Sequence, residues 1–585
     1  MLSQGKLSLP TQNFLRRLGA DEHYRKDPEE VLSVLHDTFV RFATRESLEA
    51  QDALVSLAEI SFHHASKTDD PKYFLSAVAY AWAYLFPPRE DLRAHAIDPR
   101  LRLAIDLYNR GLSRAFTDKN STGIVFRAGL HETGFGKLNI QLDDSELQWG
   151  NRRLTVFTSV AELEVRGLRN RYRWRGLGAP LAAATESVDP DDTNDFLVKN
   201  LRVPVSAVMT FDDFDGQLAS GVLETRLHLR VAYTSDSIEI NGESIGLEME
   251  PTASLAFMLT ESDPWARELK GLFQGDLEVP GSGLASLEPY HPGRIPVVLV
   301  HGTASSAARW ADILNDLTND RTIRERYQFW LFTYNTGSPI AYSAWKLRKG
   351  IHDLVKQVDP ESKDPALQRI VVVGHSQGGL LTKLTAVDSG NVLWDHVSDR
   401  SFEEMDLEPE SREILGGSLF VKPVPEVERV VFVSTPHRGS YLAEFGIAKW
   451  MSRFVRAPAN LVRVGADFVS QDAEASGIRE VERVDGAIGN MSPSSPFLAM
   501  LLDMPVASGV HSHSIISVNG GKAEPEESDG VVKYKSAHIG GVDSELVVDS
   551  GHSCQSEPLV IAELRRILLV HLGRNPAPAI RLFPK

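Results

Sequence analysis

A serine with a glycine two residues before it and another two residues after it, at the end of a run of valines, is the residue best suited to act as a nucleophile. The sequence Val371-Val-Val-Gly-His-Ser-Gln-Gly378 is typical of a buried strand that turns sharply into a helix. Glycines on both sides leave room for that turn, which raises the hydroxyl of Ser376 above the end of the strand. This pattern arises by chance in roughly one in five chains of such length, so its partners elsewhere in the chain decide its meaning.

A serine hydroxyl is a weak nucleophile, and it needs a base to take its proton and an acid to orient that base. His552 follows the predicted strand that ends at Val548, and Asp529 lies in a turn after the predicted strand 514–518. Both lie beyond the C-terminal ends of strands, where ligands bind in open α/β sheets. We therefore predict Ser376 as the nucleophile, Asp529 as the acid and His552 as the base.

Several other residues compete for the roles of base and acid: His375, His437, His511, His513, Asp543, Glu545 and Asp549. A residue beside the nucleophile points away from it in such a turn, so His375 is expected to be structural. His511 and His513 precede the predicted strand and are interpreted as loop or core residues. Asp549 is so close to His552 in sequence that orienting the ring would be awkward, which leaves Asp529 as the preferred acid.

Two backbone N–H groups normally hold the negative charge that develops on a carbonyl oxygen during acyl transfer. We expect one from Gln377, the residue after the nucleophile, and one from Thr303, which follows the predicted strand 296–300. Gly302 avoids a side chain that would crowd the substrate. The alternative is that residues 301–303 form only a strand-ending turn. The residues expected to line the substrate site are His301, Gly302, His375 and His437.

Five segments of the C-terminal half carry these residues and are jointly specific: Leu299-Val-His-Gly-Thr303, Gly374-His-Ser-Gln-Gly-Gly379, Ser434-Thr-Pro-His-Arg-Gly-Ser440, Asp529-Gly-Val-Val532 and Ser550-Gly-His-Ser553. Through them, residues 296–572 resemble the lipase and esterase branch of the α/β-hydrolases, including bacterial relatives of the GPI inositol-deacylase family. The resemblance implies the α/β-hydrolase fold, a mostly parallel sheet with helices on both faces. It also implies a serine esterase that uses the nucleophile, acid, base and oxyanion donors named above.

Composition and periodicity divide the chain into four parts. Residues 1–120 have helical periodicity, with Asp-Pro pairs that are typical of helix starts. Residues 121–280 contain short alternating runs that indicate an antiparallel β-rich region, and residues 281–295 have the glycine and proline content of a linker. In residues 296–585 strands alternate with helices, which predicts a parallel sheet and therefore the catalytic domain.

The segment between Thr435 and Ser517 is longer than a crossover between two strands needs. From Tyr441 onward it is apolar around most of a predicted helix. Insertions at this place in the resembled family often cap the active site and receive acyl chains, so we hypothesise a lid over residues 441–485. The alternative is a helix buried against the N-terminal half.

The composition excludes several classes of function. With 585 residues, 42% of them hydrophobic and 24% charged, the chain is typical of a globular protein of more than one domain. A net charge of −17 argues against nucleic-acid binding and against strong attraction to anionic membranes. Cys554 is the single cysteine and is interpreted as a packing residue. Histidine pairs lack the spacing of zinc ligands and no phosphate loop is present, so we expect no metal and no cofactor.

The leading hypothesis is a serine carboxylic-ester hydrolase, an esterase or lipase, that works through an acyl-enzyme. A thioesterase, peptidase or acyltransferase would use the same residues, and a binding protein with a relict hydrolase domain is the alternative from another class. The expected partner is a small-molecule or lipid ester, and a lipid substrate would add peripheral contact with a lipid surface. Because neither a signal peptide nor a membrane-spanning stretch is found, we expect a cytoplasmic protein or an exported one whose leader is missing.

Overall fold

The structure is a computed structural model. It describes residues 6–42, 48–88, 90–95, 97–118, 123–160, 163–189, 196–198, 201–218, 220–261, 283–303, 305–440, 463–464 and 491–574. The chain divides into two compact units, the first drawn mainly from residues 1–258 and the second mainly from residues 259–585. The short segments 167–170 and 192–199 belong to the second unit.

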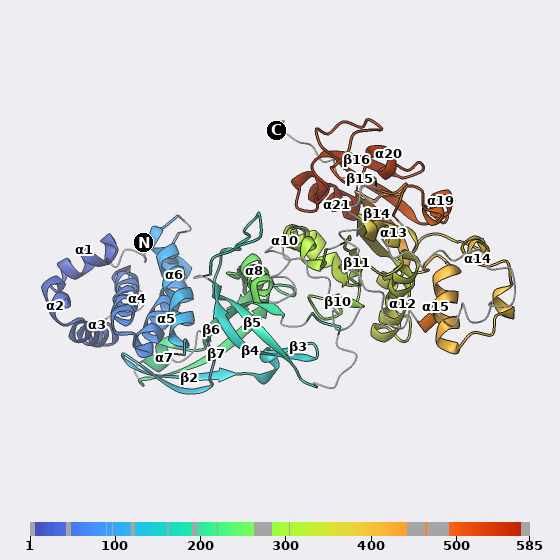
Figure 1. Ribbon diagram of the computed structural model, residues 1–585. Coiled ribbons are helices and arrows are strands. Elements are labelled where there is room, and N and C mark those ends of the chain that lie inside the picture. The colour runs from blue at the N-terminus through green and yellow to red at the C-terminus, as the bar shows by residue number, and fades with distance from the viewer. Residues whose placement is uncertain are drawn as a thin grey trace. The chain divides into compact units, whose positions relative to one another are not determined.

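The first unit begins with helices α1 (Leu9–Arg17), α2 (Asp21–Lys26), α3 (Pro28–Phe42), α4 (Leu48–Thr68), α5 (Pro71–Leu85) and α6 (Pro99–Ala115), which are blue in Figure 1. An aspartate cap and a proline start both α5 and α6, because Asp70 and Asp98 accept hydrogen bonds from the first turn of each helix. Helix α5 packs against α4 and α6, and its residues 73–85 are all buried. It is therefore the core of the helical part.

A seven-stranded sheet follows, in the order β1-β2-β7-β6-β5-β4-β3. Its strands are β1 (Gly129–Thr133), β2 (Gly136–Leu142), β3 (Gln148–Trp149), β4 (Arg152–Ser159), β5 (Ala179–Ser187), β6 (Arg202–Phe211) and β7 (Val222–Val231). Neighbouring strands are antiparallel except β2 and β7, which are parallel. The hydroxyl of Tyr108 on α6 donates to the carbonyl of Met209 on β6 at 2.6 Å, which joins the helices to the sheet.

The helical and β-rich regions, which were predicted as separate parts, thus lie in one compact unit. Smaller elements complete it: α7 (Phe214–Leu218), the hairpin of β8 (Ser237–Ile240) and β9 (Glu243–Gly246), and α8 (Pro251–Glu261).

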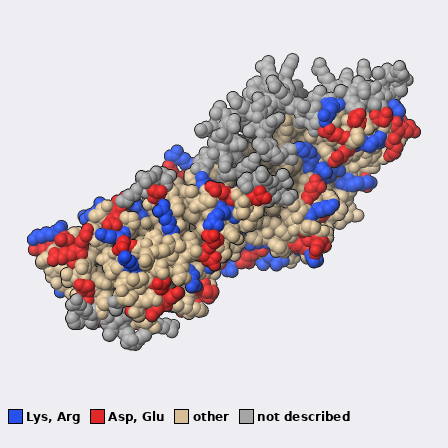
Figure 2. All heavy atoms as spheres, turned by 90° about the horizontal axis from the view of Figure 1, so that it is seen from below, with Lys and Arg blue, Asp and Glu red and all other residues tan. Residues whose placement is uncertain are grey.

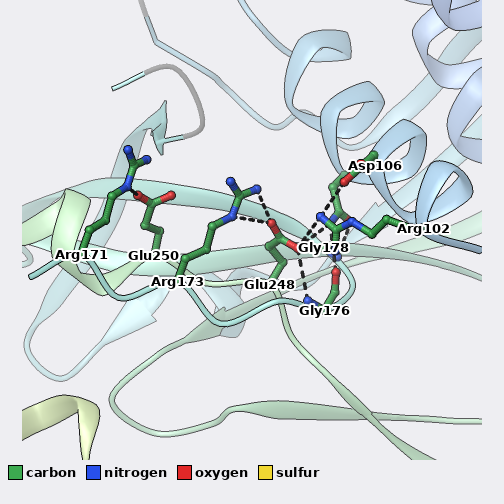
Figure 3. A network of polar contacts seen from close by, with 9 residues as sticks. Arg102, Asp106, Arg171, Arg173, Gly176, Gly178, Glu248 and Glu250 are labelled. Atoms are coloured by element: carbon green, nitrogen blue, oxygen red, sulfur yellow. Dashed lines mark hydrogen bonds and ion pairs between the residues drawn. The ribbon is translucent and has the colours of Figure 1, made fainter. Parts of the chain in front are cut away.

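Two buried glutamates tie the segment 171–178 to the residues before α8 (Figure 3). The carboxylate of Glu248 accepts hydrogen bonds from the Nε of Arg173 at 2.8 Å and from the backbone N–H of Gly176 at 3.2 Å. Glu250 is paired with Arg171. Burying a carboxylate costs free energy unless it is paired, so these contacts make the buried position of both glutamates tolerable.

The second unit contains a sheet in the order β10-β12-β11-β13-β14-β15-β16. Its strands are β10 (Leu284–Ser286), β11 (Ile295–Val300), β12 (Tyr327–Phe332), β13 (Ile370–His375), β14 (Val427–Val433), β15 (His511–Val518) and β16 (Ser544–Asp549). All neighbouring pairs are parallel except β10 and β12. Strand β10 lies inside the segment predicted as a linker. The start of β15 corrects a second expectation, because His511 and His513 lie within this strand and not before it.

The helices of the second unit are α10 (Ala311–Asn319), α11 (Arg321–Arg326), α12 (Ile340–Val358), α13 (Gln377–Lys383), α14 (Val392–Val397), α15 (Pro409–Leu419), α19 (Pro496–Asp503), α20 (Tyr534–Ala537) and α21 (Pro558–His571). Helices α12, α13 and α19 pack on one face of the sheet, against Trp330 and Phe432. Helix α21 lies on the other face, where the hydroxyl of Tyr327 donates to the carbonyl of Leu568 at 2.6 Å. The predicted fold class, a mostly parallel sheet with helices on both faces, is confirmed.

Because both faces are covered, strands β11, β12 and β13 are buried along their whole length. Only the loops at the ends of these strands can offer polar side chains to a ligand. The carboxyl ends of β11 and β13 to β16 lie at one edge of the sheet, because these strands are parallel and adjacent. On the face shown in Figure 2, acidic and basic side chains are interspersed, and neither sign gathers into one large patch.

Candidate active site

Ser376 lies at the turn between β13 and α13, in a backbone conformation that few residues adopt. Its φ of 54° and ψ of −124° are strained for a residue with a side chain, and strain of this kind clusters at functional positions. The backbone N–H of Ser376 donates to the carbonyl of Val433 at 2.9 Å, which holds the turn against β14. A Cβ atom at Gly374 or Gly378 would collide with neighbouring backbone, so the turn needs both glycines.

The imidazole of His552 lies between Ser376 and Asp529. Its Nδ1 is 2.7 Å from Oδ2 of Asp529, and its Nε2 is 2.9 Å from Oγ of Ser376. A carboxylate only accepts hydrogen bonds, so Nδ1 carries the proton and Nε2 is free to accept the proton of the serine hydroxyl. The three residues come from the ends of β13, β15 and β16, and the structure brings them together as a hydrogen-bonded set.

Asp529 is held as an ion by several donors. Its Oδ1 accepts hydrogen bonds from the backbone N–H groups of Val531 at 2.9 Å and Val532 at 2.7 Å. Burial acts to raise the pKa of Asp529, but the hydrogen bond and the charge of His552, with the two backbone donors, outweigh it and leave the pKa below its ordinary value. The carboxylate is therefore charged at neutral pH, and it accepts a hydrogen bond from Nδ1 of His552.

Five of the competing residues, His511, His513, Asp543, Glu545 and Asp549, have partners away from this set. The pairs are His511 with Asp543, His538 with Glu545, Gly520 with Asp549, and Arg429 with His513. His511 and His513 lie toward the amino end of β15, at the edge of the sheet opposite the carboxyl ends. Among these residues none contacts His552 in the part of the chain that the structure describes.

His375 contacts the loop that carries His552. Its Nε2 donates to the backbone carbonyl of His552 at 2.9 Å, and its side chain is almost fully buried. Burial, helped by the proximity of His552, lowers the pKa of His375 to about 3, so its ring is neutral at physiological pH. This contact places His375 beside the loop of His552. His375 was expected to line the substrate site, but its side chain has almost no exposed surface.

His301 and His437 are also buried. The ring of His301 stacks on Tyr334 at 4.7 Å, and burial lowers its pKa to about 4. The ring of His437 meets Phe432 edge-on at 4.9 Å, and neither of its nitrogens has a hydrogen-bond partner among the described residues. Burial holds the pKa of His437 well below its ordinary value, so both rings are neutral. They shape the site through packing.

Gly302 lies directly beside Ser376, and Thr303 contacts Gln377, the residue after it. A Cβ atom at Gly302 would lie 2.9 Å from Cβ of Ser376, a separation that real Cβ atoms do not adopt. The hydroxyl of Thr303 donates to Oε1 of Gln377 at 2.6 Å, which fixes the loop after β11 against the turn. Within the described ranges, the backbone N–H groups of Thr303 and Gln377 form no hydrogen bond. Both are therefore available to an oxyanion.

Ser517 is a contact residue that sequence reasoning missed. Its hydroxyl donates to Oδ2 of Asp529 at 2.8 Å, the oxygen that also accepts from His552. The sequence offered one signal that could have found it, a polar residue near the carboxyl end of a predicted strand. That signal alone does not distinguish Ser517 from Ser512 or Ser514 on the same strand, because the sequence does not show which strand end reaches Asp529.

The predicted lid over residues 441–485 lies outside the described residues, apart from positions 463–464. Within the described part of the chain, no helix is long and apolar enough to cross a membrane. Among the same residues, no group of three or more histidine, cysteine, aspartate or glutamate side chains is arranged to hold a metal ion.

The sequence model of the alpha/beta hydrolase family matches residues 297–564, which include every residue of the hydrogen-bonded set. None of the curated proteins is significantly similar to the chain in sequence.

Solved structures of bacterial proteins are similar to part of the chain. Lipase BlEst2 from Bacillus licheniformis, in its mature form, is 16% identical, with a TM-score of 0.30 over 50% of this chain and 98% of that one. Lipase 1 from Pelosinus fermentans is 15% identical, with a TM-score of 0.29 over 49% of this chain and 100% of that one. Phospholipase PlaB from Legionella pneumophila is 16% identical, with a TM-score of 0.24 over 42% of this chain and 45% of that one.

Proposed function

We propose that this chain, whose residues 297–564 match the sequence model of the alpha/beta hydrolase family, is a serine hydrolase that cleaves carboxylic esters. The observation that carries the proposal is the position of His552, whose ring is within hydrogen-bond distance of both Ser376 and Asp529. Acyl transfer to a serine requires a base that is hydrogen-bonded to the nucleophile and an acid that orients the base.

In the first half of the proposed reaction, Oγ of Ser376 attacks the carbonyl carbon of the ester while its proton moves to Nε2 of His552. The carbonyl oxygen becomes an oxyanion, which the backbone N–H groups of Thr303 and Gln377 stabilise. The protonated His552 then gives its proton to the leaving alcohol oxygen as the carbon–oxygen bond of the ester breaks. The products of this half are the free alcohol and an acyl group on Ser376.

In the second half, water takes the place of the alcohol. His552 removes a proton from the water as its oxygen attacks the acyl carbon, and the same two N–H groups hold the second oxyanion. The bond to Ser376 then breaks, and the serine oxygen recovers its proton from His552. Asp529 stays ionised throughout, because its role is to orient the ring and to stabilise the imidazolium.

A thioester, an amide or an acceptor other than water would pass through the same acyl-serine. These substrates differ in the group that leaves or in the acceptor, which the residues named above do not select. We propose the carboxylic ester as the substrate class. As a second proposal, the segment 441–485 is a lid that receives the acyl chain.

A series of p-nitrophenyl esters from acetate to palmitate tests both proposals. The wild-type chain and Ser376→Ala test the nucleophile, and a deletion of residues 441–485 tests the lid. We expect hydrolysis by the wild type and none above background by Ser376→Ala. Equal hydrolysis by both would refute the assignment of the nucleophile, and activity only on thioesters or amides would redirect the substrate class. If deletion of residues 441–485 costs activity on short and long esters equally, the lid proposal fails.

A further inference from the structure

A line of buried hydrogen-bonding groups continues behind Asp529. The hydroxyl of Ser517 donates to Oδ2 of Asp529 at 2.8 Å, and the hydroxyl of Ser434 lies 2.6 Å from that of Ser517. The thiol of Cys554 lies 3.3 Å from the hydroxyl of Ser434. All three side chains are essentially excluded from solvent. The set Ser376, His552 and Asp529 is therefore extended by three hydrogen-bonding groups that are buried away from solvent.

The charge on Asp529 sets the direction of every bond in this line. An ionised carboxylate only accepts, so Ser517 must donate to it, and the oxygen of Ser517 is left to accept from Ser434. The oxygen of Ser434 in turn accepts from the thiol of Cys554. Burial raises the pKa of Cys554 to about 11, so the thiol keeps the proton that this last bond needs.

The backbone around Ser434 is also arranged for this contact. Ser434 has a φ of 48°, a conformation that costs free energy for any residue with a side chain. Its backbone N–H donates to the carbonyl of Ile515 at 2.8 Å, which fixes the end of β14 against β15. The strained turn places the hydroxyl of Ser434 next to that of Ser517. The ends of β14 and β15 therefore each contribute one hydroxyl to the line of hydrogen bonds.

We propose that Ser517, supported by Ser434, is a positioning residue for the hydrolysis proposed above, because its hydroxyl fixes the carboxylate of Asp529 and shares the negative charge on Oδ2. The inference rests on the proposed function for its role in catalysis. Cys554 is the outermost donor, which gives the single cysteine of the chain a place in the line without making it a nucleophile.

Sharing that charge has a consequence for the base. A second donor on Oδ2 weakens the attraction between this oxygen and the protonated ring of His552, so removing the donor makes His552 more basic. Two titratable groups contact this ring: Asp529, and the neutral ring of His375, whose centroid lies 5.0 Å away. Arg309 acts electrostatically on His375. A change at Ser517 leaves His375 and Arg309 in place.

The test compares Ser517→Ala with Ser514→Ala, a matched change on the same strand at a serine that is equally buried and outside the line. Two rates are measured against pH: inactivation by a fluorophosphonate, which phosphonylates the nucleophilic serine with loss of fluoride, and kcat/KM for a p-nitrophenyl ester. For Ser517→Ala we expect the acidic limb of both profiles to move up by about half a pH unit to one unit. We expect the plateau to fall by about tenfold. Ser514→Ala should leave the limb where it is.

Three further variants separate positioning from mere packing. Ser517→Thr keeps the hydroxyl and is expected to restore the position of the limb even if crowding lowers the rate. Ser434→Ala should move the limb in the same direction by less than Ser517→Ala, and Cys554→Ala by less again. An unmoved limb in Ser517→Ala, or a shift of equal size in Ser514→Ala, would overturn the inference.

The ionisation of His552 can also be measured without any reaction. Carbon-13 labelling of the histidine rings and assignment with His552→Asn give its pKa by NMR in the wild type and in Ser517→Ala. A higher pKa in Ser517→Ala supports the inference, and an unchanged one refutes it. If the wild type reacts with neither probe, the proposed function fails, while this titration still decides whether Ser517 shares the charge of Asp529.

Discussion

Nε2 of His552 lies 2.9 Å from Oγ of Ser376, although the two residues are 176 positions apart in the chain. The parallel sheet makes this approach possible, because it brings the ends of β13 and β16 to the same edge with β14 and β15 between them. His552 therefore reaches Ser376 across two intervening strands. The loop of His552 is held in that position by its own backbone, whose N–H donates to the carbonyl of Asp529 at 3.0 Å.

Replacing the acid should be nearly as damaging as replacing the base. In Asp529→Asn the side chain can no longer stabilise a protonated ring, so His552 loses both its tautomer and its orientation. We expect kcat for a p-nitrophenyl ester to fall by roughly ten-thousand-fold, and a similar loss in His552→Asn. Steady-state kinetics measure both, with Asp543→Asn as the control, since Asp543 is paired with His511. A loss in Asp543→Asn as large as in Asp529→Asn would mean that the acid is misassigned.

The site should tolerate no side chain at position 302. In Gly302→Ala the new Cβ would lie 2.9 Å from Cβ of Ser376 and 3.1 Å from Nδ1 of His375. We expect kcat/KM to fall by about a hundredfold, because a misplacement of about 1 Å at the nucleophile costs this much. Gly350→Ala is the control, since its Cβ would meet Leu284 only at 3.9 Å and alanine stabilises the interior of α12. Equal activity in the two variants would contradict the close approach.

The hydroxyl of Thr303 should matter through the loop that it fixes. Thr303→Val keeps the shape of the side chain but removes the donor to Oε1 of Gln377. We expect kcat to fall by about tenfold with little change in KM, because an oxyanion donor that is poorly held acts only on the transition state. Thr303→Ser, which keeps the hydroxyl, should recover most of the rate. A rise in KM with unchanged kcat would show that Thr303 acts on substrate binding instead.

Acid should destabilise the second unit partly through His375. Burial first, and the proximity of His552 second, lower the pKa of this ring from 6.5 to about 3. Between these two values the unfolded chain binds a proton that the folded chain does not. The stability linked to His375 is thus fully present above pH 6.5 and is lost as the pH falls toward 3. The loss has an upper bound of about 1.4 kcal/mol for each pH unit.

Urea unfolding at neutral and at mildly acidic pH measures that loss. His375→Gln should be less stable than the wild type at neutral pH, and it should lose less stability on acidification. His396→Gln is the control, because His396 is exposed on α14. If the wild type and His375→Gln lose the same stability, protonation of His375 does not contribute to acid unfolding.

The sequence alone predicted which residues come together better than it predicted what surrounds them. Ser376, Asp529 and His552 were expected to lie close together because each follows a predicted strand, and parallel strands place such residues at one edge. The roles of His375 and Ser517 could not be found in this way, since they depend on which loop packs beneath which. The length of β15 was underestimated because its first residues, His511 to His513, are polar, and propensity does not show that Arg429 and Asp543 are their partners.

The first unit shows a different limit. Short alternating runs predicted strands between residues 121 and 280, but the order of those strands depends on pairings distant in sequence. The clearest case is β2, which pairs in parallel with β7 through Leu138 and Leu223. An antiparallel meander would satisfy the same alternation, so the pattern cannot select the observed order. The burial of Glu248 and Glu250 was equally hidden, because a glutamate is ordinarily exposed unless partners such as Arg173 neutralise it.

The most direct test of the central claim is the mass of the protein after rapid mixing with a p-nitrophenyl ester and quenching in acid. We expect one acyl group on each chain, located on Ser376 by peptide mapping, with release of the first p-nitrophenolate faster than steady turnover. The same group should be absent from Ser376→Ala. Hydrolysis that proceeds with no acylated protein, or with the acyl group on another residue, would contradict the assignment of Ser376 as the nucleophile.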